Sequence, residues 1–254
     1  TAVGTNRATF SPNFQYFINS FSSATKAPTF TLNDSNSGNV IKTIVSNEAL
    51  EQKLAKYDVV PKEFTTITTE KGHTLNAWFI NPKDFDPIIK YPVFMYQYSG
   101  PGSQQVANQW NGTNDYWFMM LAQQGYIVAC VDGRGTGFKG AEFKKCTYKE
   151  LGKFEVEDQI DAAKLIGNYP YVDKSRIGIF GWSYGGCMSS TCIFKGNDVC
   201  KAAIAVAPVT SWRYYDTIYT ERYNQTPQEN ASGYDEKSPI NHVSKLKGNY
   251  ILNH

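Results

Sequence analysis

The chain has 254 residues, of which 41% are hydrophobic and 19% are charged, a composition typical of a folded globular protein. Its 25 basic and 23 acidic residues leave a net charge of +2, which is too small to attract nucleic acid or an anionic membrane. No stretch approaches the roughly 18 apolar residues of a membrane span. Composition therefore excludes a disordered chain, and we expect neither nucleic-acid binding nor a membrane span.

Cysteine and histidine content argues against a disulfide scaffold and against a metal centre. The five cysteines are odd in number and contain no CxxC pair, and the three histidines form no HExxH motif. We therefore expect no metal and no organic cofactor.

The first fifty residues differ in texture from the rest of the chain. Short β-type runs at 14–21 and 29–32 are separated by Asn, Ser and Gly residues, which predicts small antiparallel strands. Residues 47–56 favour a short helix, and Pro61 follows it. We place a domain boundary near residues 55–62.

Beyond this boundary the chain first predicts a hairpin and then alternates between strands and helices. Runs at 64–69 and 75–81 flank Gly72, which suits a left-handed turn position. Further apolar strands are expected at 92–98, 126–131, 176–180, 202–207 and 250–252, with helices at 116–124, 155–166 and from 184. Strands that read as continuous apolar runs between helices predict an α/β fold with a mostly parallel sheet covered on both faces.

The sequence Gly181-Trp182-Ser183-Tyr184-Gly185 matches the pattern GxSxG between a predicted strand and a predicted helix. A sharp turn in this context exposes the serine hydroxyl and directs backbone N–H groups toward a developing oxyanion. The alternative is a glycine-rich turn whose serine is inert. The strand and helix on either side favour a nucleophile.

A serine nucleophile needs a histidine base and a carboxylate, which follow the serine in this kind of sheet. Only His242 and His254 follow Ser183. His242 lies in a polar segment interrupted by proline and is interpreted as a surface or helix-capping residue. His254 is the last residue and follows the apolar run 250–252, which predicts the next parallel strand.

Several motifs together resemble the prolyl oligopeptidase family of serine peptidases, and within it the bacterial members that release N-terminal dipeptides. They are Tyr98-Ser99-Gly100-Pro101, Val131-Asp132-Gly133-Arg134-Gly135-Thr136-Gly137, Phe154-Glu155-Val156-Glu157-Asp158-Gln159-Ile160, the segment Gly181–Gly186 and the segment Trp212–Arg222. The resemblance implies an α/β-hydrolase domain at 56–254, preceded by the end of a β-propeller at 1–55.

The resemblance also implies roles for individual residues. Ser183 would be acylated, and the backbone N–H of Tyr184 and the phenol of Tyr98 would hold the oxyanion. A phenol suits this task because it is a neutral donor at pH 7. Without the resemblance, Tyr98 could equally be a tyrosine that ends a buried strand. Asp132 and Arg134 are interpreted as structural.

An apolar pocket for the side chain before the scissile bond is implied as well. It would be lined by Tyr184, Val209, Trp212, Tyr215 and Tyr219, and a slot of flat rings suits a proline ring. The alternative is that this aromatic segment packs in the core. Tyr215 and Tyr219 have helical spacing. The resemblance places Arg222 near the substrate carbonyl groups, although it could be an ordinary surface residue.

In the family, the catalytic Asp and His follow the strand that resembles residues 250–252, and two glutamates of the propeller bind the substrate amine. All four would lie outside these 254 residues, so we expect negligible peptidase activity from the chain alone.

The leading prediction is a serine exopeptidase that releases N-terminal dipeptides after a penultimate Pro or Ala. A homodimer located in the periplasm or at the cell surface is implied by the resemblance. Two alternatives remain open: a catalytically silent interaction protein, and a related acylaminoacyl peptidase or endopeptidase. The segment Trp212–Arg222 argues against the second.

Overall fold

The computed structural model describes residues 2–57 and 60–254. The chain divides into two compact units, one formed by Thr1–Lys62 with Ala107–Gln123 and the other by Glu63–Val106 with Gln124–His254. The boundary expected near residues 55–62 includes residues 58 and 59, which lie outside the described residues. None of the helices in the described part is long and apolar enough to cross a membrane.

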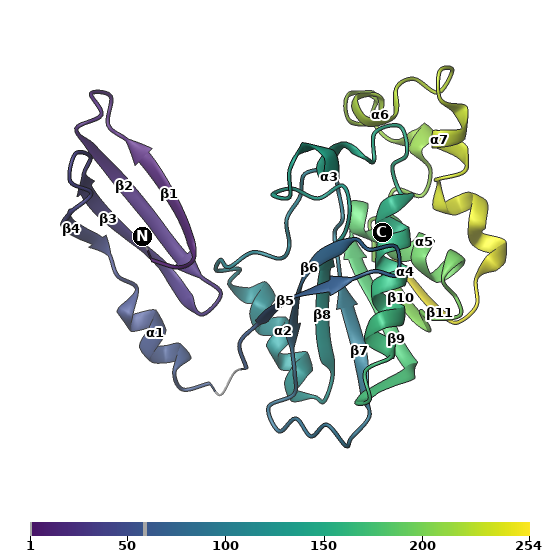
Figure 1. Ribbon diagram of the computed structural model, residues 1–254, viewed down its shortest axis with the longest axis horizontal. Helices are drawn as coiled ribbons and strands as arrows, with labels where there is room; N and C mark the ends of the chain where they lie inside the picture. Colours follow the sequence, from purple (N-terminus) through teal and green to yellow (C-terminus); the bar gives the residue numbers. More distant parts are fainter. Residues whose placement is uncertain (1, 58–59) are drawn as a thin grey trace. The chain divides into compact units, whose positions relative to one another are not determined.

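The first unit contains a four-stranded antiparallel sheet in the order β1-β2-β3-β4 (Figure 1). Its strands are β1 (Thr5–Phe10), β2 (Tyr16–Ser23), β3 (Lys26–Asp34) and β4 (Val40–Val45). The predicted strand at 14–21 overlaps β2 and the one at 29–32 falls within β3, whereas β1 and β4 were not predicted. Such a meander fits one blade of a β-propeller, as expected.

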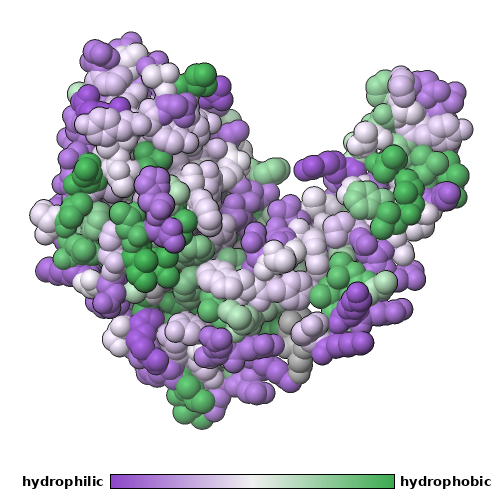
Figure 2. All heavy atoms as spheres, turned by 180° about the vertical axis from the view of Figure 1, so that it is seen from behind, coloured by the Kyte–Doolittle hydropathy of each residue, from purple (hydrophilic) through white to green (hydrophobic). Residues whose placement is uncertain are grey.

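Apolar side chains gather on this sheet (Figure 2), and the large exposed ones include Ile18, Val40, Ile41, Ile44 and Val45. Apolar exposure on this scale is typical of a sheet that packs against another layer. The same unit contains α1 (Glu48–Leu54), which confirms the predicted short helix, and α2 (Thr113–Gln123), which begins three residues earlier than predicted.

The second unit is built on a seven-stranded mixed sheet in the order β11-β10-β9-β7-β8-β6-β5. Its strands are β5 (Glu63–Thr68), β6 (Thr74–Ile80), β7 (Tyr91–Tyr96), β8 (Ile127–Asp132), β9 (Val172–Trp182), β10 (Ala202–Val206) and β11 (Asn249–Asn253). The five strands from β11 to β8 pair in parallel, while β6 pairs antiparallel with both β8 and β5. The predicted α/β fold with a mostly parallel sheet is confirmed.

The hairpin of β5 and β6 closes as the sequence predicts. Gly72 has a φ of +83°, a left-handed conformation that L side chains rarely adopt, and its N–H donates to the carbonyl oxygen of Thr69 at 2.9 Å. Of these seven strands, β6 alone runs against the direction of the others, and the β5–β6 hairpin forms the edge of the sheet away from β11.

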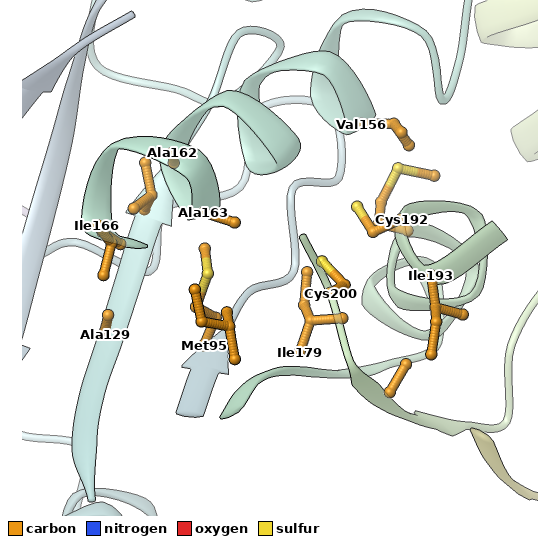
Figure 3. Close-up of a cluster of buried hydrophobic side chains, with 14 of the residues drawn as sticks. Met95, Ala129, Val156, Ala162, Ala163, Ile166, Ile179, Cys192, Ile193 and Cys200 are labelled. Carbon is orange, nitrogen blue, oxygen red and sulfur yellow. The ribbon is translucent and has the colours of Figure 1, made fainter. Parts of the chain in front are cut away.

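Helices α4 (Phe154–Gly167) and α5 (Tyr184–Lys195) form the main helical cover of the core. Figure 3 shows Ala163 and Ile193 of these helices facing Met95 and Ile179 of the sheet. These four side chains are almost completely buried. Val156 and Ala163 lie on the buried face of α4, while Ile160 packs at its margin.

The remaining segments of the second unit are short. They are α3 (Ala141–Lys145), the 3-10 helices η1 (Trp212–Tyr214) and η2 (Pro239–Lys245), α6 (Thr217–Asn224) and α7 (Ala231–Asp235).

The strand order reverses at β7, which has β8 on one side and β9 on the other. The carboxyl ends of strands at such a switch point form a crevice where ligands bind in open α/β sheets. Tyr96 of β7 pairs with Phe180 of β9, so Tyr98 and Ser183 both follow the sheet at this edge. The topology therefore brings together two residues that lie 85 positions apart in the sequence.

Candidate active site

Ser183 is the bend between strand β9 and helix α5. Its backbone has φ 56° and ψ −115°, a sparsely populated combination for a residue with a Cβ. The bend is held in place because the Ser183 N–H donates to the carbonyl oxygen of Val206 at 2.8 Å, on the neighbouring strand β10. The strand, turn and helix predicted around the GxSxG pattern are therefore present.

The two outer glycines of the pattern are required by close packing. A Cβ on Gly181 would collide with the carbonyl oxygen of Gly185 and would lie 2.7 Å from the side-chain nitrogen of Gln97. A Cβ on Gly185 would lie 2.5 Å from the carbonyl oxygen of Gln97 and 3.1 Å from the Cα of Tyr98. The first turn of α5 thus rests directly on residues 97 and 98.

The Ser183 hydroxyl is not used to stabilise the helix that it precedes. Ser183 occupies the N-cap position of α5, where a serine side chain usually accepts a backbone N–H, yet it makes no capping hydrogen bond. The side chain is only partly buried. The first N–H groups of a helix have no intrahelical acceptor and carry partial positive charge. A partly exposed hydroxyl beside unsatisfied donors is an arrangement that can support nucleophilic attack on a carbonyl group.

Tyr98 lies against the same helix start. The centroid of its ring is 6.1 Å from that of Tyr184, and its side chain is partly buried. Ser99, which follows it, has a φ of 64° and therefore turns the chain sharply after the strand. Within residues 2–57 and 60–254, no group hydrogen-bonds to the Tyr98 hydroxyl. That hydroxyl is therefore available to a ligand.

The five residues predicted to line an apolar pocket form a continuous set of contacts. The ring of Trp212 lies 5.6 Å from that of Tyr184 and 6.3 Å from that of Tyr215, and Tyr215 lies 5.6 Å from Tyr219. Val209 is buried in the same cluster. The Tyr184 and Trp212 rings are tilted at 45°, whereas the Trp212–Tyr215 and Tyr215–Tyr219 pairs meet edge to face at 84° and 89°, so these rings do not form a flat stack.

The helical spacing of Tyr215 and Tyr219 is misleading. Tyr215 is extended, with φ −88° and ψ 165°, and helix α6 begins only at Thr217. Asp216 caps this helix by accepting the N–H of Tyr219 at 2.8 Å. A capped turn, and not one helix face, brings the two rings together.

Burial raises the pKa of Tyr219, and the neighbouring Tyr98 raises it further. The aromatic cluster and the Tyr98 ring therefore share one environment.

Glu155 contacts Tyr184 of the aromatic cluster, a role that was not predicted from the sequence. Its carboxylate accepts a hydrogen bond from the Tyr184 hydroxyl at 2.6 Å and another from the N–H of Gly152 at 3.1 Å. Burial raises its pKa to about 7, although these two hydrogen bonds act in the opposite direction. The sequence did contain a signal, because Glu155 and Gln159 stand four residues apart on the same face of α4 as the apolar Ala162, Ala163 and Ile166.

Gln97 is the second unpredicted residue beside the site. It is completely buried, and its side-chain nitrogen donates to the carbonyl oxygen of Gly185 at 2.7 Å. An amide directly after an apolar strand and directly before Tyr98 is the only signal of this role in the sequence.

Arg222 and the two C-terminal histidines do not join this cluster of contacts. Arg222 is exposed on α6. The ring nitrogen Nε2 of His242 lies 2.7 Å from the carbonyl oxygen of Glu236. Burial lowers the pKa of His242, and nearby lysines, including Lys195, lower it further. Lys195 is the last residue of α5, at the opposite end of that helix from Ser183. His242 is thus a surface residue of η2, as interpreted from the sequence, and His254 is exposed after β11.

Asp132 and Arg134 hold loops in place, as predicted. The Asp132 carboxylate accepts the N–H groups of Gln105 at 2.9 Å and Val106 at 2.8 Å. The Arg134 guanidinium forms a bidentate pair with Asp158, with contacts of 2.7 and 3.0 Å. Among the described residues, no group of three or more His, Cys, Asp or Glu side chains could hold a metal ion.

This geometry defines an α/β-hydrolase type of fold with a strained serine at the bend before α5, and comparison with known proteins agrees. Residues 113–254 match the prolyl oligopeptidase family. The chain is 46% identical over 209 residues to the probable dipeptidyl-aminopeptidase B of Paracoccidioides lutzii, covering 82% of this chain and 22% of that protein. It is 37% identical over 250 residues to the dipeptidyl peptidase 4 of Trichophyton equinum, covering 97% of this chain and 32% of that protein.

Among solved structures, the crystal structure of Porphyromonas gingivalis dipeptidyl peptidase 4 is 50% identical with a TM-score of 0.96, over 99% of this chain and 35% of that one. The chain belongs to the prolyl oligopeptidase family. It spans between 22% and 35% of the length of these relatives.

Proposed function

We propose that the complete protein containing this chain is a serine exopeptidase that releases N-terminal dipeptides after a penultimate Pro or Ala. The observation that carries the proposal is the strained, non-capping Ser183 at the start of α5. Strain of this kind costs on the order of 1–3 kcal/mol and persists where the surrounding structure imposes it, commonly at functional sites. Names of the relatives, which include dipeptidyl peptidases, support the same reaction class.

In the proposed reaction, the Ser183 oxygen attacks the carbonyl carbon before the scissile bond and forms an acyl-enzyme. The resulting oxyanion accepts hydrogen bonds from the Tyr98 hydroxyl and from the N–H of Tyr184. These donors are in place before the reaction, so little reorganisation is needed when charge develops. A histidine and a carboxylate outside these 254 residues transfer the proton to the leaving amine and later activate water.

The aromatic cluster supports the proposed preference for proline or alanine. The rings of Tyr184, Trp212, Tyr215 and Tyr219 offer apolar walls without a charged group among them. A proline ring lacks an N–H and so leaves no donor unsatisfied in such a pocket. Arg222, exposed on the adjacent helix, is proposed to contact the substrate carbonyl groups. A homodimer in the periplasm or at the cell surface completes the proposal.

Covalent labelling of the complete protein tests the nucleophile. A fluorophosphonate probe should label the protein, and Ser183→Ala should abolish the label, while Ser190→Ala on the same helix should retain it. A label that survives Ser183→Ala would reject the proposed nucleophile. Faster hydrolysis of a Gly-Pro chromogenic amide than of its N-blocked analogue is expected from an exopeptidase, and the reverse order would favour an endopeptidase.

A further inference from the structure

The side chain of Gln97 forms a buried cross-link inside the nucleophile bend. Its amide nitrogen donates to two groups in the first turns of α5, the carbonyl oxygen of Gly185 at 2.7 Å and the Oγ of Ser189 at 2.9 Å. It occupies the space that a Cβ on Gly181 would need. The amide therefore fills the inside of the bend and is bonded to the helix that follows it.

Both ends of this amide are satisfied, so its orientation is determined. The Ser99 hydroxyl donates to the Gln97 Oε1 at 3.0 Å, and Ser99 Oγ in turn accepts the side-chain nitrogen of Gln159 at 3.3 Å. Gln159 also donates to the carbonyl oxygen of Val131 at 2.8 Å. These side chains are all at most 1% exposed. A buried network of this kind is rigid because no water can replace a lost partner.

The network joins the two segments that carry the proposed oxyanion donors. Gln97 immediately precedes Tyr98, and Gly185 immediately follows Tyr184. Strand β7 and helix α5 are otherwise separate elements whose relative position depends on packing. The hydrogen bond from Gln97, beside Tyr98, to Gly185, beside Tyr184, limits how far the two proposed donors can shift relative to each other.

We propose that Gln97 is a positioning residue that sets the spacing between the Tyr98 hydroxyl and the Tyr184 N–H by bonding Gly185 and Ser189. The inference rests on the proposed function, because it concerns stabilisation of the oxyanion. Such stabilisation is sensitive to donor position, and a displacement of about 1 Å can cost on the order of 100-fold in rate. Substrate affinity depends mainly on the aromatic pocket and is unaffected.

The first test replaces the amide by an apolar chain of similar length. In the complete protein, Gln97→Met should lower kcat for a Gly-Pro amide by about 10-fold to 100-fold and leave KM within about twofold. The rate of fluorophosphonate labelling should fall in parallel, since that adduct also places an oxygen in the oxyanion site. A rise in KM with unchanged kcat would overturn the proposal.

A matched control comes from the same helix. Thr191 is completely buried and its Oγ1 donates to the carbonyl oxygen of Cys187 at 2.9 Å, away from both donors. Thr191→Val removes a buried hydrogen bond with little change of shape and should alter kcat by less than about twofold. An equal loss of kcat in the Thr191 and Gln97 variants would show that Gln97 is only structural.

A double-mutant cycle with Tyr98 decides whether Gln97 acts through the donor. Tyr98→Phe removes the hydroxyl, so adding Gln97→Met to it should lower kcat much less than in the wild type. Fully additive losses would overturn the proposal. If Gln97→Met does not fold, Ser99→Ala removes the donor to Gln97 Oε1 together with the weaker acceptor for Gln159. This variant should give a smaller loss of kcat in the same direction, and an unchanged kcat would count against the inference. A wild-type protein that neither labels nor hydrolyses would refute the proposed function instead.

Discussion

Glu155 should make the stability of the protein depend on pH in a specific way. The side chain is completely buried against Tyr184, and burial raises its pKa from 4.5 to about 7. A carboxyl group whose pKa is raised by folding stabilises the folded state fully below its ordinary pKa. This stability is lost as the pH rises from about 4.5 through about 7, because the folded protein must then bury a charge.

The magnitude follows from the two pKa values. The gap between 4.5 and about 7 corresponds to a loss of about 3 kcal/mol in the free energy of unfolding at pH 8. Glu155→Gln carries no charge and keeps an oxygen for the Tyr184 hydroxyl, but it loses the acceptor for the Gly152 N–H, at a cost of about 1 kcal/mol. At pH 5 the wild type has already lost about 1 kcal/mol of this stability, so the variant and the wild type should be about equally stable there. At pH 8 the variant should be more stable than the wild type by about 2 kcal/mol.

Urea unfolding of the complete protein at pH 5 to 8, followed by tryptophan fluorescence, measures this difference. Glu157→Gln is a control on the same helix. Despite partial burial, the Lys71 and Arg134 cations lower the pKa of Glu157, so its variant should lose more stability at high pH than at low pH. A difference between wild type and Glu155→Gln that stays constant from pH 5 to 8 would refute the reasoning.

Three further predictions concern the bend, the oxyanion donor and the loop behind them. Tyr98→Phe should lower kcat about 100-fold to 1000-fold with little change in KM, and an unchanged kcat in steady-state assays would remove Tyr98 from the mechanism. In urea unfolding, the free energy of unfolding of Ser183→Gly should exceed that of Ser183→Ala by about 1–2 kcal/mol, because glycine tolerates φ 56°. Equal stability of the two variants would show that the bend is not strained. Asp158→Asn should lower the free energy of unfolding by about 3–5 kcal/mol, because it leaves the guanidinium of Arg134 without its buried partner. The control Asp173→Asn, at a more exposed ion pair, should change the free energy of unfolding little in the same experiment, and equal effects of the two substitutions would contradict this prediction.

Local patterns in the sequence were sufficient to predict most of the elements. Continuous apolar runs identified the strands that become β7, β8, β9 and β10, because parallel strands are buried on both faces. The turn at Gly72 and the bend at Ser183 were predictable because each depends on residue types within a few positions. Strands β1 and β4 and the short helices after β10 were missed, since each is short and most of its residues are not buried, which leaves little apolar pattern in the sequence.

The candidate site was only partly predictable for the same reason. Ser183, Tyr98 and the aromatic residues were named from motifs, and the structure brings Tyr98, Tyr184, Trp212 and Tyr215 into one series of ring contacts. Their catalytic and binding roles stay predictions. Tyr215 and Tyr219 have helical spacing in the sequence, but they do not share a helix, because Asp216, which lies between them, is the N-cap of α6.

The sequence by itself determined the α/β class, the bend at Ser183 and the membership of a peptidase family, because each is expressed in residues that are adjacent or regularly spaced. Only the tertiary structure showed that Gln97 is bonded to the first turn of α5 and that Glu155 is buried beneath Tyr184. A buried polar side chain has the same appearance in a sequence as an exposed one. The hydrogen-bond partner of a buried polar side chain depends on how strands and helices are placed against one another, and that placement depends on the packing of the whole core.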